Sequence, residues 1–144
     1  MLELYELAHE ARARAYAPYS GFRVGAALRG RDGQVFVGVN VENASFPVTI
    51  CAERGALMSA VAAGVREFDS LAVVTDALEP AAPCGMCRQM LAEFGLDLPI
   101  LGAGREGPTH LVRLRDLLPS AFTRSSFELR SLVMPAQGVA ATDT

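Results

Sequence analysis

The sequence predicts an α/β protein that folds as a three-layer α/β/α sandwich with a mixed five-stranded sheet. The main observation behind this prediction is that, after an initial hairpin, short runs of strand-forming residues alternate with segments of helical periodicity. The second is length: 144 residues, of which 51% are hydrophobic and 20% charged, suffice for one core without disulfide bonds. We therefore expect helices on both faces of a single sheet.

The N-terminal third is expected to form a helix followed by a β-hairpin. Residues 2–16 carry Leu and Ala at helical spacing, and Pro18 ends that pattern. Two runs that contain Val and Phe, at 22–30 and 34–40, predict strands. The Asp-Gly pair at 32–33 is a hairpin turn signal, so we expect these two strands to be antiparallel.

The rest of the chain alternates between helices and short strands. Helices are expected at 51–63 and 84–94, because each has apolar residues at helical spacing and a glycine just after its end. The other expected elements are strands at 71–76, 99–103 and 109–114, followed by a helical turn at 115–122 that breaks at Pro119.

Composition and charge exclude several classes of function. The net charge of −3 and the lack of a Lys/Arg run argue against a nucleic acid polymer as partner. No apolar stretch approaches the roughly 20 residues of a membrane span, and no signal-peptide pattern is present, so we expect a cytoplasmic protein without membrane contact. Residues 1–134 are expected to form one domain, whereas 135–144 lack large apolar side chains and predict a flexible tail.

The three cysteines predict a metal site. Cys84 and Cys87 are spaced i, i+3 at the start of an expected helix, so their sulfurs can hold one ion, and Cys51 opens another expected helix. Helix N-termini favour the thiolate form that binds metal. Zn²⁺ suits three such ligands, and a site with only three protein ligands keeps a position for water, which is typical of catalytic zinc. We therefore expect one Zn²⁺ in an open site.

Glu53 is the candidate catalytic residue. Zinc lowers the pKa of a bound water from roughly 15.7 to about 7, and the released protons need a carboxylate that lies beside the metal without binding it. Glu53 follows Cys51 by two residues. Zinc deaminases combine a Cys₃ ligand set, an unbound glutamate and a P-C-x-x-C segment, and this chain has all three.

Four ordered motifs carry a resemblance to a known family. C-A-E at 51–53, P-C-G-M-C-R-Q at 83–89, Y-S-G-F-R-V-G-A-A at 19–27 and N-V-E-N-A at 40–44 together resemble the homotetrameric cytidine deaminases. The resemblance implies a cytidine deaminase-like catalytic domain. It also implies hydrolytic deamination of cytidine and 2′-deoxycytidine in pyrimidine salvage, by a homotetramer with shared active sites.

The resemblance also implies which residues bind substrate. Phe22 would pack against the pyrimidine ring, and the backbone N–H of Ala52 would contact the base. Asn40 and Glu42 would bind the ribose hydroxyls, and their spacing of two at a strand end lets both side chains face the same way. Phe122 would enter the pocket of a neighbouring subunit.

Two arginines are expected to support the metal site. Three thiolates on Zn²⁺ leave a net negative cluster, which Arg54 and Arg88 can offset. By resemblance, Arg54 donates hydrogen bonds to the ligand sulfurs, which tunes the metal through its ligands. Arg23 has no assigned role, and Phe46 stands where the family often has Tyr.

Several alternatives remain at this stage. The cysteines could form a redox pair or a structural zinc site, which would make the chain a non-catalytic zinc-binding module. Phe22 could be a core residue, and Phe122 could pack within its own subunit. A deaminase of a modified cytosine nucleoside, such as blasticidin S, shares the same chemistry, whereas an RNA- or DNA-editing deaminase is disfavoured by the acidic charge.

Overall fold

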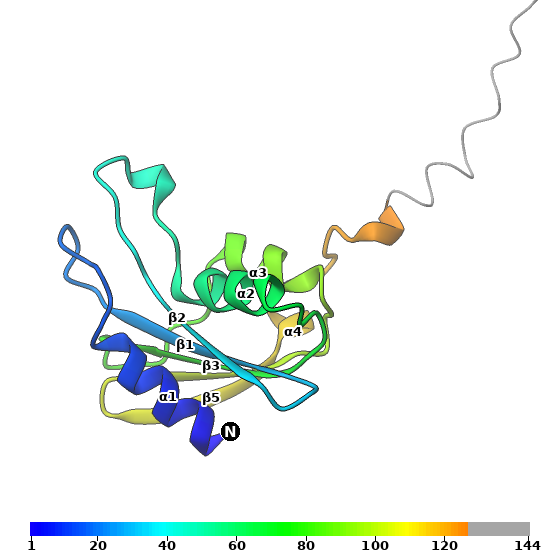
Figure 1. The fold of residues 1–144 in the computed structure, drawn as a ribbon, viewed down its shortest axis with the longest axis horizontal. Helices are drawn as coiled ribbons and strands as arrows, with labels where there is room; N and C mark the ends of the chain where they lie inside the picture. Colours follow the sequence, from blue (N-terminus) through cyan, green and yellow to red (C-terminus); the bar gives the residue numbers. More distant parts are fainter. Residues whose placement is uncertain (127–144) are drawn as a thin grey trace, which may run out of the picture.

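A mixed five-stranded sheet forms the centre of the computed structural model, which describes residues 1–126 (Figure 1). The strand order is β2-β1-β3-β4-β5; β3 and β4 pair in parallel, and the other neighbours are antiparallel. This arrangement confirms the predicted mixed sheet. Its strands are β1 (Val24–Gly30), β2 (Val35–Val39), β3 (Phe68–Thr75), β4 (Pro99–Gly104) and β5 (Gly107–Arg113).

Helices cover both faces of the sheet, which confirms the predicted three layers. The helix α1 lies on one face, and α2, α3 and α4 lie on the other (Figure 1). None of the helices in the described part of the chain is long and apolar enough to cross a membrane. The helices are α1 (Leu2–Arg12), α2 (Ala52–Ala62), α3 (Gly85–Ala92) and α4 (Leu114–Leu117), with a short 3₁₀ turn η1 (Phe46–Val48).

The two faces of the sheet bury separate apolar clusters. Alternate residues of β1 divide between them, since Ala26 and Leu28 pack under α2 and α3 whereas Ala27 packs against α1. The strand β3 is buried along its last six residues, with Ala72 on the α1 side and Val73 on the α2 side. Such double-sided burial explains why the sequence of β3 is a continuous apolar run.

The first helix is shorter than the sequence predicts. It ends at Arg12 rather than at residue 16, because Tyr16 joins an isolated bridge to Val41. The Tyr16 N–H donates to the Asn40 carbonyl at 3.0 Å, and the Glu42 N–H donates to the Tyr16 carbonyl at 2.8 Å. These bonds bring the segments before β1 and after β2 together at one end of the sheet (Figure 1).

Other differences are confined to element ends. The helix α3 stops at Ala92, two residues before the expected end, and Gly95 follows with a φ of 139°. The expected helical turn at 115–122 is the single turn α4. The expected tail at 135–144, and the last residues of the expected domain, lie outside the described residues.

Gly38 lets α2 lie directly on β2. A Cβ atom at Gly38 would come within 2.2 Å of the Ala52 carbonyl oxygen and 2.3 Å of the Ala56 nitrogen. Both neighbours are backbone atoms of α2, which cannot move aside as a flexible side chain can. Because Ala52 is the first residue of α2, this close approach fixes where the helix starts and therefore where Cys51 and Glu53 lie.

Gly38→Ala is expected to lower the free energy of unfolding by about 3 kcal/mol, because the added methyl overpacks the contact with α2. Gly102→Ala is the matched control, since a Cβ there would meet its nearest atoms at an ordinary 3.5 Å. We expect that control to change stability by less than about 1 kcal/mol. Chemical denaturation followed by circular dichroism measures both values, and equal losses for the two variants would contradict the close-approach account.

Candidate metal centre and active site

The three cysteines meet at one point of the structure. The Sγ atoms of Cys51 and Cys84 are 3.8 Å apart, and those of Cys84 and Cys87 are 3.6 Å apart. All three lie within 4.8 Å of one another, and none forms a disulfide bond. Ligands about 2.3 Å from one tetrahedral zinc ion would lie roughly 3.8 Å from each other. The spacing of the sulfurs therefore fits a single Zn²⁺.

Two helix starts deliver these sulfurs. Cys51 is the N-cap residue of α2 and Cys84 is the N-cap residue of α3, and neither side chain caps its own helix. Their thiols are therefore available to a metal ion. Cys87 lies in the first turn of α3 and is buried. Within residues 1–126 no histidine, aspartate or glutamate joins this cluster, so three protein ligands leave one coordination position for a non-protein ligand.

A pocket of about 310 Å³ opens beside the cysteines. The segment that precedes β1, the end of β2, the start of α2 and the loop before α3 all contribute to it. Its size and mixed polarity fit a small ligand such as a nucleoside. Of the residues predicted to bind substrate or metal, the pocket brings together Phe22, Asn40, Glu42, Cys51, Ala52, Glu53 and Cys84.

Glu53 lies in this pocket but is not part of the metal cluster. Its side chain is 5% exposed, in the first turn of α2. The pKa of Glu53 is raised, chiefly because burial disfavours the carboxylate and also because of repulsion by the Cys51 thiolate. A buried carboxyl with a raised pKa, beside a metal site and open to a pocket, holds a proton more readily than an exposed one and is suited to proton transfer.

Comparison with known proteins identifies the family. Residues 2–103 match the family described as the cytidine and deoxycytidylate deaminase zinc-binding region. The chain belongs to this deaminase family. It is 46% identical to the cytidine deaminase of Sporosarcina psychrophila, over 80% of this chain and 85% of that protein. It is also 46% identical to the cytidine deaminase of Halalkalibacterium halodurans, over 83% of this chain and 92% of that protein.

Solved structures of this deaminase family have the same fold. The crystal structure of cytidine deaminase from Burkholderia pseudomallei is 50% identical and superposes with a TM-score of 0.81, covering 84% of this chain and 98% of that one. Cytidine deaminase from Mycobacterium tuberculosis is 42% identical, with a TM-score of 0.73, covering 84% of this chain and 95% of that one. The predicted cytidine deaminase-like fold is thereby confirmed.

The charge at the cysteines is distributed unevenly before metal binds. The pKa of Cys51 is lowered to about 5, chiefly because Cys87 hydrogen-bonds to it and in part because of Arg54. The pKa of Cys87 is raised, because it acts as the donor to Cys51 and is itself buried. Cys51 is therefore a thiolate at neutral pH, and a divalent cation bound to it would favour ionisation of Cys87 as well.

Arg54 contacts the metal site directly. Its Nη2 atom donates to the Thr49 carbonyl at 2.7 Å and to the Cys51 sulfur at 3.8 Å. Burial works against the charge of Arg54, but the Cys51 thiolate outweighs that effect, and the pKa of Arg54 is raised. This geometry supports the expected role of Arg54 as a donor to a ligand sulfur.

The side chain of Arg88 donates hydrogen bonds to backbone carbonyls. Its Nε atom donates to the Pro83 carbonyl at 2.6 Å and its Nη1 atom to the Leu117 carbonyl at 2.8 Å. Pro83 directly precedes Cys84, so Arg88 fixes the loop that presents this cysteine. Both of these hydrogen bonds go to backbone carbonyls and neither goes to a cysteine sulfur, so they do not bear on the expected contribution of Arg88 to the charge of the cluster.

Phe122 lies away from the pocket of its own chain. Its side chain is 58% exposed, and its carbonyl accepts a hydrogen bond from Gln89 Nε2 at 2.7 Å. Phe122 does not line the pocket that contains the cysteines. Gln89 follows Arg88 in α3, so consecutive residues of one helix hold the segment that carries Phe122.

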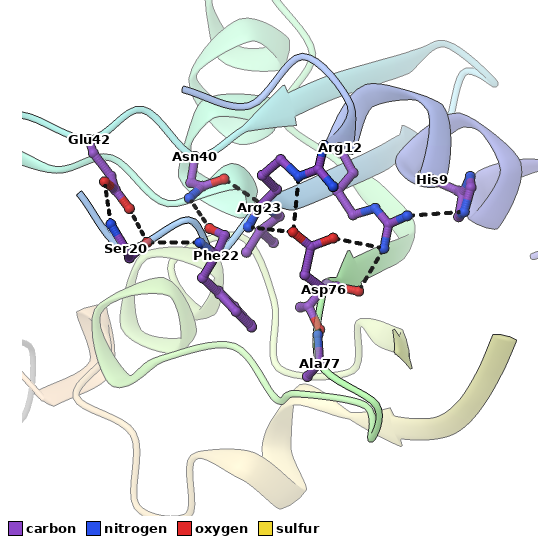
Figure 2. A network of polar contacts seen from close by, with 11 residues as sticks. His9, Arg12, Ser20, Phe22, Arg23, Asn40, Glu42, Asp76 and Ala77 are labelled. Carbon is purple, nitrogen blue, oxygen red and sulfur yellow. Dashed lines mark hydrogen bonds and ion pairs between the residues drawn. The ribbon is translucent and has the colours of Figure 1, made fainter. Parts of the chain in front are cut away.

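Asn40 and Glu42 hold the edge of the pocket. Asn40 donates from Nδ2 to the Phe22 carbonyl and accepts the Val24 N–H at Oδ1, both at 2.8 Å. Glu42 hydrogen-bonds to Ser20, which lowers the pKa of Glu42 (Figure 2). It also accepts the Tyr19 N–H at 2.8 Å. Each side chain keeps further donor or acceptor capacity for a ligand.

The sequence did not single out every residue of the pocket. Ser20 lies inside the motif at 19–27, and its contacts with Glu42 and with the Phe22 N–H could have been suspected from that motif. Thr49, Thr75, Ala81 and Ala82 also line the pocket. The last three lack a local sequence signal, because they reach the pocket through the fold: Thr75 ends β3, and Ala81 and Ala82 lie in the loop before α3.

Cys51 is expected to be the most reactive cysteine once metal is removed. Because its pKa is lowered to about 5, it is a thiolate at neutral pH, and its reactivity should be lost as the pH falls through about 5. Timed alkylation of the metal-stripped protein with peptide mass mapping measures this midpoint. The variant Arg54→Met should move the midpoint upward, whereas a wild-type midpoint near the usual thiol value of about 8.5 would contradict the assignment.

Proposed function

We propose that the chain hydrolyses cytidine and 2′-deoxycytidine to uridine and 2′-deoxyuridine with release of ammonia. The observation that carries this proposal is the pairing of a three-cysteine metal site, open at one position, with a buried glutamate that does not join it. When bound there, zinc supplies a Lewis acid that makes water acidic near neutral pH. Membership of the deaminase family supports the same reaction.

Glu53 would move the protons of the reaction. Addition of water across the C4–N3 bond of cytosine requires that one proton leaves the water and one reaches N3. Departure of ammonia then requires that the proton of the new C4 hydroxyl reaches the amino nitrogen, as the C4–N bond breaks and the C4 carbonyl of uridine forms. A single carboxyl with a raised pKa can serve both transfers in turn, because it gains and loses a proton easily. Glu53 is the one carboxyl beside the cysteines among the residues that line the pocket.

Phe22 and Ala52 would hold the base. Phe22 lines the pocket and is 40% exposed, so its ring is available to pack against a pyrimidine. Ala52 is the first residue of α2, where a backbone N–H has no partner within the helix. That N–H can donate to a carbonyl oxygen of the base.

Asn40 and Glu42 favour a free nucleoside over a polynucleotide. Both line the pocket, and together they offer amide and carboxylate groups to a sugar diol. The lowered pKa of Glu42 keeps its carboxylate charged at neutral pH. A charged carboxylate repels a 3′-phosphate, and the net charge of −3 also disfavours a polyanion.

Glu53→Gln is expected to keep bound zinc and to lower kcat for cytidine at least about 10³-fold, because the amide cannot carry protons. Ammonia release in a coupled assay measures the loss, and metal analysis on the same sample checks zinc retention. Glu67→Gln, which breaks an exposed ion pair with Arg31, is the control and should keep wild-type activity. Substantial turnover by Glu53→Gln would remove Glu53 from the mechanism.

The same assay separates the rival substrates. Cytidine, deoxycytidine, CMP and blasticidin S should be compared under identical conditions, and we expect the two free nucleosides to have the highest kcat/KM. A preference for blasticidin S would favour the modified-nucleoside alternative. Bound zinc without ammonia release from any substrate would favour the non-catalytic module.

A homotetramer with shared active sites is also part of the proposal, together with a cytoplasmic role in pyrimidine salvage. Exposed large apolar side chains gather in the two segments that flank the pocket edge, and a partner subunit could bury them. Three unpaired cysteines suit a reducing compartment. In these two segments the exposed large apolar residues are Tyr16, Tyr19 and Phe22 before β1, and Val41, Phe46 and Val48 after β2.

Subunit mixing tests whether Phe122 acts in a neighbour. Phe122→Ala and Glu53→Ala are each expected to lose activity as pure tetramers. Co-expressed together, they should recover activity, because a pocket with an intact Glu53 can receive Phe122 from the other variant. Full activity of pure Phe122→Ala, or hybrids that stay inactive, would contradict the shared site.

A further inference from the structure

Asp76 lies between two arginines at the point where β3 ends (Figure 2). Its Oδ2 atom accepts the Arg23 backbone N–H at 3.1 Å and the Arg23 Nε–H at 3.0 Å. Its Oδ1 atom pairs with Arg12 Nη1 at 3.2 Å. The Asp76 N–H in turn donates to the Arg23 carbonyl at 3.1 Å, so the two residues bind each other through both main chain and side chain.

These bonds extend the sheet by one residue toward the pocket. The regular pairing of β1 with β3 ends at Val24 opposite Thr75, and Arg23 with Asp76 adds one more step. Phe22 comes directly before Arg23. The backbone of Phe22 is therefore anchored to the end of β3 through its neighbour.

The opposite side of Phe22 is held by other residues. Its carbonyl accepts from Asn40 Nδ2 at 2.8 Å, and its N–H donates to Ser20 Oγ at 3.0 Å. Asp76 therefore supplies the anchor on the β3 side, and Asn40 supplies the anchor on the β2 side (Figure 2). Without the side chain of Asp76 or of Asn40, the Phe22 segment keeps side-chain contacts on only one of these two sides.

The network around Asp76 is more protected than an ordinary surface ion pair. The side chains of Arg12 and Asp76 are 12% and 18% exposed and that of Arg23 is 48% exposed, whereas those of Arg31 and Glu67 are 70% and 75% exposed. Partial burial alone would raise the pKa of Asp76, but hydrogen bonds from Arg23 and the charges of both arginines lower it. Charge-assisted bonds that are partly shielded from solvent by one buried partner hold geometry better than pairs in which both side chains are exposed.

Arg12, the other arginine paired with Asp76, contacts a second wall of the pocket. Thr75, which lines the pocket, accepts a hydrogen bond from Arg12 Nη1 at its carbonyl, at 2.9 Å. The chain beyond Asp76 leads through Ala81 and Ala82, which line the pocket, to Cys84. The segment that carries Phe22 ends at Arg23, and the segment that leads to Cys84 begins at Asp76. Both segments therefore join the sheet at this pair of bonded residues.

We propose that Asp76 is a positioning residue, which acts through Arg23 to hold Phe22 where it packs against the pyrimidine ring of the substrate. This inference rests on the proposed deamination of a cytosine nucleoside. It gives Arg23 a role that the sequence alone did not suggest. Loss of Asp76 should weaken substrate binding more than it slows the proton transfers at Glu53.

A double-mutant cycle between Asp76 and Phe22 tests the proposal. Asp76→Ala should raise KM for cytidine about tenfold, with a smaller change in kcat and unchanged zinc content, because the lost bonds are charge-assisted. In the background of Phe22→Ala, the same change should raise KM by less than about twofold, since a residue that acts through Phe22 has nothing left to position. If Asp76→Ala does not fold, Asp76→Asn keeps the shape and removes the charge.

Hydrogen exchange gives a readout that does not depend on activity. Amides at 20–24 should exchange faster in Asp76→Ala than in wild type, whereas Glu67→Gln should leave them unchanged. Equal KM factors in both backgrounds, or unaltered exchange at these amides, would overturn the role of Asp76. Wild-type protein that releases no ammonia from cytidine would instead refute the proposed function, and the exchange data would still decide whether Asp76 holds the Phe22 segment.

Discussion

The active site depends on the close approach of the N-terminal ends of two helices, α2 and α3. The N-terminal ends of α2 and α3 bring three thiols within one ion's reach, at the places where unpaired N–H groups favour thiolates. Before metal binds, Cys87 donates a hydrogen bond to the Cys51 sulfur and is itself buried, which is why the raised pKa of Cys87 accompanies the lowered pKa of Cys51. Metal binding and local folding are therefore coupled at this point.

The sheet supplies the geometry for this meeting. The parallel pairing of β3 with β4 sends α3 to the same face as α2, and Gly38 lets α2 settle on β2 without a side chain between them. Glu53 is buried as a direct result, because it lies in the first turn of a helix that is pressed against the sheet. The same packing that places the metal ligands thus sets the proton affinity of the residue beside them.

Sequence patterns predicted the parts of the site that are local in the chain. The C-A-E and P-C-x-x-C motifs determine the spacing of the cysteines through helix geometry, and runs of strand-forming residues indicate the sheet. The cysteine cluster and the strands could therefore be predicted from the sequence. The bond between Asp76 and Arg23 could not, because it joins residues 53 positions apart, and the pattern within each expected strand does not tell which residues of the two strands lie opposite each other. The end of α1 at Arg12 was missed for a similar reason, since the bridge from Tyr16 to Val41 overrides local helical preference.

X-ray absorption at the zinc edge of the purified protein tests the central claim most directly. The account predicts one zinc ion with three sulfur neighbours at about 2.3 Å and one lighter neighbour that exchanges with solvent. A metal-free protein, or an ion enclosed by four protein ligands, would contradict it, because no position would then remain for the reacting water.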